Sequence, residues 1–138
     1  SLIGYWYVTA KKKGIDFTVN ISIPMKMPFK GADICLILGN LLENAVEAAE
    51  KVEGKKYIKI QMKYDKNNLL LFVMNNYKGQ LVKIKDKRLK STKSDAGNHG
   101  VGLPSVYRAV HKYHGTVVVD DSVSERFLIR VVLYGGQE

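Results

Sequence analysis

The side chains with the clearest chemical potential fall in one segment, residues 33–51, whose Leu, Ala and Glu content favours a helix. At 100° per residue its polar residues share one stripe, within about 100° of arc. The members of the stripe are Asp33, Asn40, Glu43, Asn44 and Glu47. The stripe has no Lys or Arg, and Asn is unfavourable in an exposed helix interior. Carboxylate and amide oxygens suit Mg²⁺, so the stripe predicts a magnesium site; the alternative is an amphipathic helix with its polar side in water.

A second candidate is the glycine-rich stretch Gly97-Asn98-His99-Gly100-Val101-Gly102-Leu103, directly before a second helical segment. Glycines let backbone amides approach an anion, and a helix N-terminus adds the positive end of its dipole. A flexible hinge explains such glycines at least as often. The stretch matches neither a P-loop nor a Rossmann fingerprint. Of the three histidines, only His99 is a site candidate.

Two further segments carry polar groups. Six basic residues lie between positions 83 and 93: Lys83, Lys85, Lys87, Arg88, Lys90 and Lys93. Three interpretations are open: the segment is simply solvated, one or two of its members contact phosphates, or it docks to an acidic partner. Asn75-Asn76-Tyr77-Lys78-Gly79 follows an apolar run and reads either as a turn or as a polar group at a strand end, aimed into a pocket. Cys35 is expected to be a small core residue on the apolar side of its helix.

The elements that must position these groups follow from apolar periodicity. Strands are expected over residues 17–23, 57–64, 69–74, 116–120 and 127–133, with the third fully buried and a turn at 65–68 making a hairpin. Helices are expected over residues 33–51 and from 102 or 103 to 114, the second ended by Gly115. Residues 1–13 are read as the end of a helix stopped by Gly14. Residues 75–98 lack periodicity and form a long loop.

This order predicts an α/β two-layer sandwich, with one mixed β-sheet and helices on one face. The other face of the sheet must then be polar or covered by something else. The 138 residues suit one domain, and their average composition excludes disordered and collagen-like classes. The longest apolar run is too short to cross a bilayer, and a single cysteine excludes an internal disulfide. The net charge of +9 invites a phosphate-bearing partner.

Three of these segments match known motifs in one order. Asn40-Leu41-Leu42-Glu43-Asn44-Ala45-Val46-Glu47-Ala48 resembles the asparagine box, N-L-L-x-N-A-x-x-A, of the ATP-binding catalytic domain of sensor histidine kinases, in the GHKL (Bergerat-fold) ATPase superfamily. His99-Gly100-Val101-Gly102-Leu103 resembles the glycine box of that family. Ser91-Thr92-Lys93 resembles the S/T-x-K stretch in the lid of the Agr-like, peptide quorum-sensing branch. The resemblance covers residues 14 to about 135.

The resemblance implies roles for individual residues. Asn44 would coordinate Mg²⁺ bridging to the phosphates of ATP, and Asn40 stands where hydrolysing relatives have a catalytic Glu. The catalytic candidates are therefore Asn40 and Glu43. The residues expected to bind the nucleotide are Asn44, Asn75, Gly79, Lys93, His99, Gly100, Gly102 and Leu103. The chain departs from the usual adenine box D-x-G-x-G, because Asn75 replaces the Asp and Tyr77 the first Gly.

The implied activity is transfer of the γ-phosphoryl group of ATP to a histidine on a separate dimerisation domain upstream of Ser1, with a response regulator as an indirect partner. Residues 1–13 would be the end of a helix from that domain. Residues 14–138 would be the catalytic domain, with a lid over about 77–99. It would be a cytoplasmic part of a membrane-bound sensor, without membrane or nucleic-acid contact of its own. The alternatives are a nucleotide-binding regulatory domain of this fold without kinase activity and a basic nucleic-acid-binding module.

Overall fold

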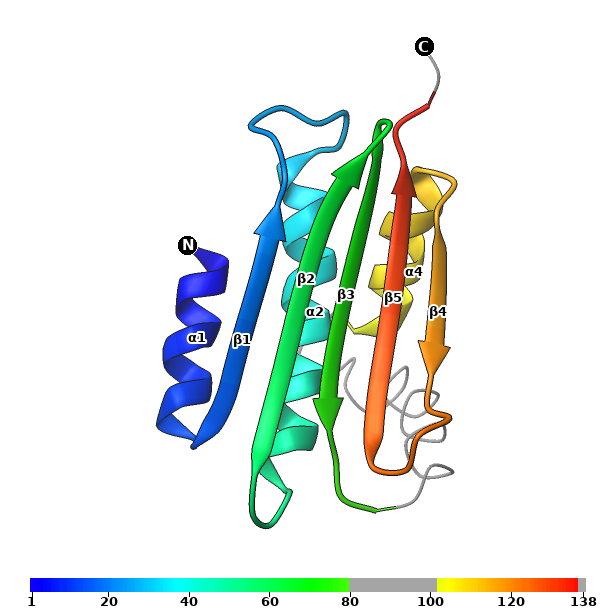
Figure 1. Ribbon diagram of the computed structural model, residues 1–138. Coiled ribbons are helices and arrows are strands. Elements are labelled where there is room, and N and C mark those ends of the chain that lie inside the picture. Colours follow the sequence, from blue (N-terminus) through cyan, green and yellow to red (C-terminus); the bar gives the residue numbers. More distant parts are fainter. Residues whose placement is uncertain (80–101, 137–138) are drawn as a thin grey trace.

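The computed structural model describes residues 1–79 and 102–136. Five strands form one sheet in the order β1-β2-β3-β5-β4, in which only β1 and β2 pair in parallel. The elements are α1 (Leu2–Lys12), β1 (Ile15–Ser22), α2 (Gly31–Glu50), β2 (Lys56–Asp65), β3 (Asn68–Asn76), α4 (Leu103–Lys112), β4 (Thr116–Asp120) and β5 (Arg126–Tyr134). Helices α2 and α4 lie on one face of the sheet, and α1 lies beside β1 (Figure 1). The predicted two-layer α/β sandwich is confirmed.

The hairpin β2–β3 forms the centre of the sheet. Its two turn residues, Lys66 and Asn67, have φ angles of 51° and 69°, the left-handed conformation that a two-residue hairpin requires. This turn fixes the register, which pairs Asp65 with Asn68 and Ile58 with Asn75. One face of the hairpin then carries buried apolar side chains on alternate residues. They are Ile58, Ile60, Met62, Leu69, Leu71 and Val73.

Helix α2 packs on this apolar face and contacts β1, β2 and β3. Its buried apolar residues are Ile37, Leu38, Leu41, Leu42, Ala45, Val46 and Ala49. Each large aliphatic side chain removed from water contributes about 1.5–3 kcal/mol, so this contact is the main source of the helix's stability and fixes its rotation. No helix among the described residues is long and apolar enough to cross a bilayer.

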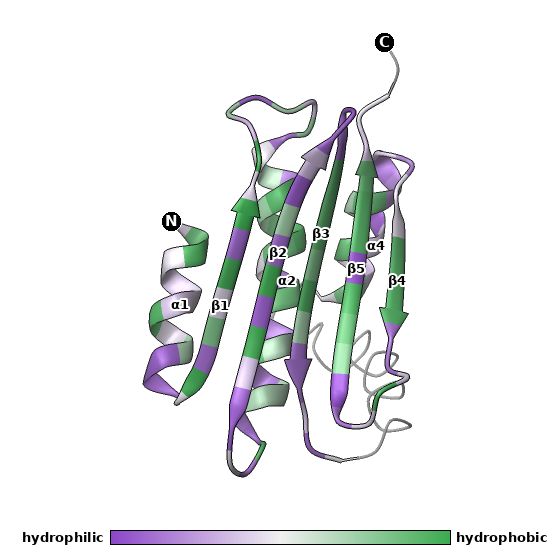
Figure 2. Ribbon diagram, in the orientation of Figure 1, coloured by the Kyte–Doolittle hydropathy of each residue, from purple (hydrophilic) through white to green (hydrophobic). Residues whose placement is uncertain are grey.

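Several local predictions are wrong in informative ways. Cys35 is exposed although rotation of 100° per residue places it within about 20° of Leu42, because it lies in the first turns of α2, before the buried residues of the helix begin at Ile37. Strand β3 is not buried throughout: Leu69, Leu71 and Val73 are, but the residues between them are only half-buried. Figure 2 shows β3 as a nearly unbroken apolar strand, although no described helix covers its second face. Helix α4 ends at Lys112, earlier than expected.

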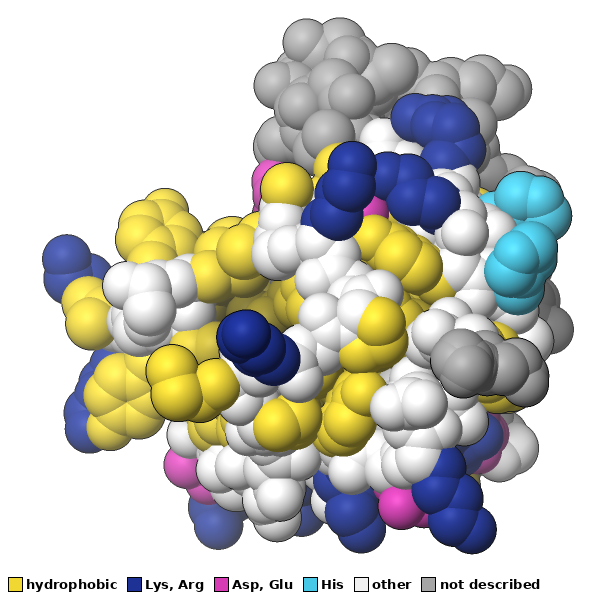
Figure 3. All heavy atoms as spheres, turned by 90° about the horizontal axis from the view of Figure 1, so that it is seen from above, with side chains coloured by type: hydrophobic (Ala, Val, Ile, Leu, Met, Phe, Trp, Pro, Cys, Tyr) yellow, Lys and Arg dark blue, Asp and Glu magenta, His cyan; other side chains and the backbone are white. Residues whose placement is uncertain are grey.

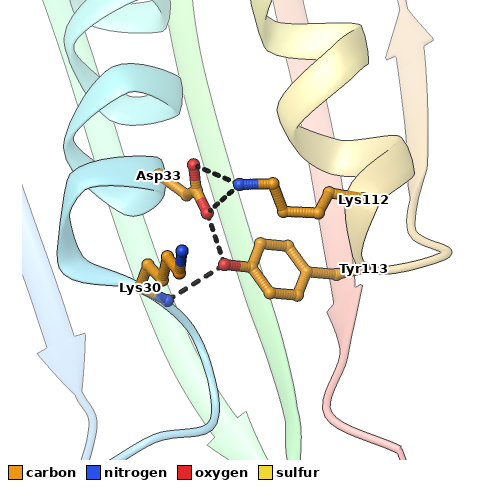
Figure 4. Close-up of polar contacts among 4 residues, drawn as sticks. All are labelled: Lys30, Asp33, Lys112 and Tyr113. Atoms are coloured by element: carbon orange, nitrogen blue, oxygen red, sulfur yellow. Dashed lines mark hydrogen bonds and ion pairs between the residues drawn. The ribbon is translucent and has the colours of Figure 1, made fainter.

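The first turn of α2 and the end of α4 are joined by polar contacts (Figure 4). The Tyr113 hydroxyl donates to Asp33 Oδ2 and accepts from the backbone N–H of Lys30 at 3.0 Å, while Lys112 Nζ lies 3.1 Å from Asp33 Oδ2. The hydrogen bond from Tyr113, followed by the contact with Lys112, holds the pKa of Asp33 below its usual value. Burial, then the same hydrogen bond, raises the pKa of Tyr113. The two helices are therefore tied at this end of the molecule.

Tyr113→Phe removes the hydroxyl from this tie and is expected to destabilise the fold by about 1–2 kcal/mol at neutral pH. Because the pKa of Asp33 is lowered in the folded state, the contribution of its carboxylate is present above the unfolded pKa and is lost as the pH falls through the lowered value. Urea unfolding at pH 7 and pH 3 should show a difference from the wild type that shrinks in acid. Tyr134→Phe, at an exposed tyrosine, is the control. An equal loss at both pH values would contradict the assignment.

The turn from α4 into β4 depends on close packing at Gly115. Gly115 was expected to end the helix, but the left-handed residue at this turn is His114, with φ of 57°. A Cβ on Gly115 would instead overlap the carbonyl oxygen of Val132 and lie 2.9 Å from Val110 Cγ1. The absence of a side chain therefore lets β4 begin directly against β5 and the end of α4.

Gly115→Ala is expected to lower the free energy of unfolding by about 1–3 kcal/mol, because backbone must move to relieve the overlap. Gly31→Ala is the matched control, since a Cβ there meets no atom within 4 Å. Thermal unfolding of the two variants beside the wild type measures the difference. Equal midpoints for both would show that the turn relaxes freely.

Candidate functional site

The predicted site residues that the structure describes gather at one end of the molecule, apart from Asp33. The carboxyl end of β3, the second half of α2 and the amino end of α4 all lie at this end (Figure 1). The tie between Asp33 and Tyr113 lies at the opposite end. Asp33 precedes Asn44 by eleven residues, about 16 Å along a helix. It therefore belongs to the fold rather than to the polar group around Asn44.

Asn75 occupies the last part of β3 and is 2% exposed. It shares a face of the strand with Leu71 and Val73, so its side chain points to the layer between sheet and helices. Its Nδ2 donates to the carbonyl oxygen of Asn76 at 2.9 Å. A buried amide carries a large desolvation cost unless it is hydrogen-bonded, which makes this the least expected polar group of the core. The segment is thus strand at Asn75 and Asn76, not a turn.

Asn76 has a different role from its neighbour. Its Oδ1 accepts from the backbone N–H of Tyr57 at 3.0 Å and its Nδ2 donates to the carbonyl oxygen of Lys55 at 2.8 Å. These bonds satisfy backbone groups where β2 begins. Asn76 therefore closes the end of the β2–β3 pair, and only Asn75 is placed toward the helices.

The polar stripe of α2 lies on the side turned away from Leu38, Leu42 and Ala45, as the 100° rotation per residue requires. Asn40 is 7% exposed, and its Nδ2 donates to the carbonyl oxygen of Leu36 at 2.7 Å. Glu43, Asn44 and Glu47 are half-buried. The two carboxylates and two amides present oxygen atoms on successive turns, the donor set that a hard cation prefers.

A cation at this stripe would need ligands from elsewhere. Within residues 1–79 and 102–136, no group of three or more His, Cys, Asp or Glu side chains is arranged to hold a metal ion. Mg²⁺ commonly binds through one or two protein oxygens and completes its shell with water and substrate phosphates. The stripe fits that mode and not a cage made entirely of protein ligands.

The amino end of α4 has a backbone conformation and a charge that suit an anion. Gly102 precedes the helix with φ of 122° and ψ of −164°, and its carbonyl oxygen accepts from the N–H groups of Ser105 and Val106 at 3.0 and 3.2 Å. The first turn has no acidic residue, so no side chain of that turn neutralises the positive end of the dipole. Leu103 is buried and anchors this turn in the core.

The remaining predicted residues divide into two groups. Gly79 is exposed, with φ of 113°, two residues beyond the buried Tyr77. Lys93, His99 and Gly100 lie outside the described residues, as do Ser91 and Thr92.

Two residues at this end were missed by the sequence analysis. Tyr77 is 4% exposed and its N–H donates to the carbonyl oxygen of Glu125 at 3.2 Å, so it belongs to the body and not to the loop. The alternation Val73, Asn75, Tyr77 was the signal available. Ser105 is also buried, and its Oγ accepts from Arg108 Nη2 at 3.0 Å.

Gly102→Ala is expected to destabilise the fold by about 1–3 kcal/mol, because the φ and ψ of Gly102 lie in a region that only glycine adopts readily. The substitution should also displace the first turn of α4. Gly39→Ala is the control: a Cβ there makes an ordinary contact of 3.9 Å with Leu2 Cδ1, and alanine favours the helix. Urea unfolding compares the three proteins. Wild-type stability of Gly102→Ala would refute the need for this backbone conformation.

Comparisons with known proteins agree with this arrangement. A family model described as the GHKL domain matches residues 29–133. Comparison with curated proteins finds no match. Among solved structures, the catalytic domain of histidine kinase ThkA is similar with a TM-score of 0.73 and 20% identity, over 97% of this chain and 90% of that one. The mycobacterial sensor histidine kinase MprB has a TM-score of 0.69 and 18% identity, over 96% and 91%.

Acinetobacter baumannii histidine kinase AdeS is similar with a TM-score of 0.67 and 15% identity, over 99% of this chain and 62% of that one. At such identities these structures establish the shared fold. The family model spans most of the chain, including the asparagine-rich stripe of α2, Asn75 and the first turn of α4. The chain is therefore a member of the GHKL domain family.

Proposed function

We propose that this chain is the ATP- and Mg²⁺-binding catalytic domain of a two-component sensor histidine kinase. It would transfer the γ-phosphoryl group of ATP to a histidine on a separate domain. The observation that carries the proposal is the buried carboxamide of Asn75, pointing into the helix layer at the end where Asn44 and Gly102 lie. The similar kinase ShkA was solved in complex with AMPPNP, an ATP analogue.

The base of the nucleotide would lie against Asn75. Because Nδ2 of Asn75 is used by the carbonyl oxygen of Asn76, Oδ1 is the atom that can accept from an exocyclic amino group. That polarity favours adenine, which carries such a donor, over a base with a carbonyl at the same place. Tyr77, buried on the same side of the chain two residues on, would shield the base from water.

The phosphates would lie between α2 and the amino end of α4. Asn44 would contribute an oxygen to Mg²⁺, and the half-buried carboxylates of Glu43 and Glu47 would add negative charge that favours the cation. Mg²⁺ neutralises charge on the transferred phosphoryl group. The N–H group of Leu103 would bind a phosphate oxygen directly, because Pro104 has no N–H and those of Ser105 and Val106 donate to the carbonyl oxygen of Gly102. Lys93, His99, Gly100 and Gly79 are proposed to complete this binding.

Asn40 indicates transfer rather than hydrolysis. A carboxamide neither accepts nor gives up a proton near neutral pH, so Asn40 cannot act as a general base on water as a carboxylate can. Its Nδ2 is bound to the carbonyl oxygen of Leu36, which fixes the group and leaves its oxygen for positioning. Glu43, one turn along, is the carboxylate proposed to take part in proton transfer with the acceptor.

The acceptor histidine is proposed to belong to a dimerisation domain upstream of α1. The two described histidines, His111 and His114, lie at the carboxyl end of α4, on the side of the fold opposite the proposed phosphate site. Residues 1–13 would then be the end of a helix leading from that domain, and the chain would be a cytoplasmic part of a membrane-bound sensor. A response regulator would receive the phosphoryl group afterwards. The Asn at position 75, in place of the Asp of the usual adenine box, also favours assignment of the chain to the Agr-like branch of these kinases.

Nucleotide binding tests the first half of the proposal. Isothermal titration with ATP and Mg²⁺ is expected to give a micromolar to millimolar Kd, and Asn44→Ala should weaken it by roughly tenfold or more through loss of a metal ligand. Asn20→Ala, at an exposed asparagine of β1, should bind as the wild type. No heat of binding by the wild type, with or without Mg²⁺, would refute the proposal.

Transfer needs a separate measurement. The chain is mixed with the helical dimerisation domain of its own parent and labelled ATP, and acid-labile, base-stable label on that domain is the expected product. Binding without such label would assign the chain to the nucleotide-binding domains of this fold that lack kinase activity.

A further inference from the structure

Among the described residues, strand β4 is an edge strand with few of the features that normally protect an edge. It pairs with β5 alone among the described residues, and its five pairs from Thr116 to Asp120 run without a bulge. Its residues include no Lys and no Pro, and the only charged one is the last, Asp120, which pairs with Arg126 of β5. Native edges are usually blunted by such residues because the free N–H and C=O groups of an edge invite another strand. The outer edge of β4 therefore remains competent to pair.

A groove of about 670 Å³ lies beside this edge, between α4 and β4. Its lining residues are Tyr107, Arg108, Val110, His111, Gly115 and Val117. Val110 is buried and Val117 half-buried, so the floor is apolar, while Tyr107 is 41% exposed and stands along the wall. The volume falls within the range of pockets that hold several side-chain groups. A strand added to β4 would direct every second side chain toward this groove.

The guanidinium group of Arg108 and the imidazole of His111 line the groove, and none of the described lining residues is a carboxylate. Lys112 follows on the same helix, with its ammonium group paired to Asp33. Figure 3 shows histidine side chains gathered at this edge of the molecule, on the same side as β4 in Figure 1. A ligand matched to the groove therefore combines apolar groups with a carboxylate.

We propose that the β4 edge and the α4–β4 groove bind an extended peptide segment of a partner protein, which adds to the sheet as a further strand. On the groove side the segment presents apolar side chains to Val110, Val117 and Tyr107, and an acidic side chain to Arg108 and His111. Backbone hydrogen bonds along β4 supply affinity, and the groove supplies selectivity, as in other cases of strand addition. The site is distinct from the proposed nucleotide site and does not depend on it.

Two pairs of variants separate this site from the rest of the surface. Val117→Lys places a charge in the floor of the groove, and Val118→Lys makes the same change one residue on, where the side chain lies on the opposite face of β4 and is 47% exposed. Arg108→Glu reverses the charge at the groove. Lys59→Glu makes the equivalent reversal at an exposed residue of β2, away from it. Thermal unfolding identifies any variant that fails to fold. If Val117→Lys fails to fold, the comparison of Arg108→Glu with Lys59→Glu, both at exposed positions, still tests the proposal.

The probe is a phage-displayed library of random dodecapeptides, panned against the 138-residue chain. Selected peptides are synthesised with a fluorophore and titrated by anisotropy. We expect peptides that alternate apolar and acidic residues on one side of an extended chain. Their Kd should rise about tenfold or more with Arg108→Glu and with Val117→Lys, and remain unchanged with the two control substitutions. Every second backbone nitrogen of the peptide can be N-methylated in two ways, at the odd or at the even positions. One of these two phases should weaken binding by a similar factor, because it removes the N–H groups that donate to β4.

The proposal is overturned if no peptide is enriched or if binding is insensitive to Arg108→Glu. Binding that survives N-methylation in both phases would also overturn it, because it would indicate docking through side chains alone. A fourth contrary result is dimerisation of the chain in sedimentation that Val117→Lys abolishes, which would assign the edge to a second copy. Because no step requires a nucleotide, each of these results is independent of the proposed kinase function.

Discussion

The packing of α2 against the β2–β3 hairpin is the constraint on which the rest of the molecule depends. One helix has to supply an apolar seam for the sheet and, on its other side, a row of oxygen ligands. The seam through Leu38, Leu42 and Ala45 sets the rotation of the helix. Once that rotation is set, Asn40 and Asn44 have no freedom to point elsewhere. Packing of the core thus also sets the directions of the candidate site residues on α2.

The same packing explains why a polar group is tolerated in the core at Asn75. The strand alternation that buries Leu71 and Val73 continues through positions 75 and 77, so the face cannot change without a shift of register. The carboxamide is accommodated by a bond to the next residue's backbone. A neutral amide at this place avoids the larger cost of burying a carboxylate. The site therefore combines an uncharged deep end with a half-buried acidic stripe on α2.

Sequence reasoning predicted the elements whose signals are local. The alternation in β1, β2 and β5, the turn at Lys66-Asn67 and the stripe from Asn40 to Glu47 all follow from periodicity or turn chemistry. It failed where a residue's environment is set by distant parts of the chain. Cys35 is exposed although it lies on the same side of α2 as Leu42, and Gly115 is required because a Cβ there would overlap Val132, which strand pairing brings next to it. Nothing in residues 33 or 113 alone indicated that they meet.

The contact between Asp33 and Tyr113 also limits how the two helices can move. It joins the beginning of α2 to the end of α4, while the opposite ends of these helices carry Asn44 and Gly102. Because α2 and α4 are joined at one end, they can separate at the other end only through a change in the angle between their axes. Any change of that angle would displace α4 by an amount that grows with distance from Tyr113. The first turn of α4, where the displacement would be largest, is the turn that buried Leu103 anchors in the core.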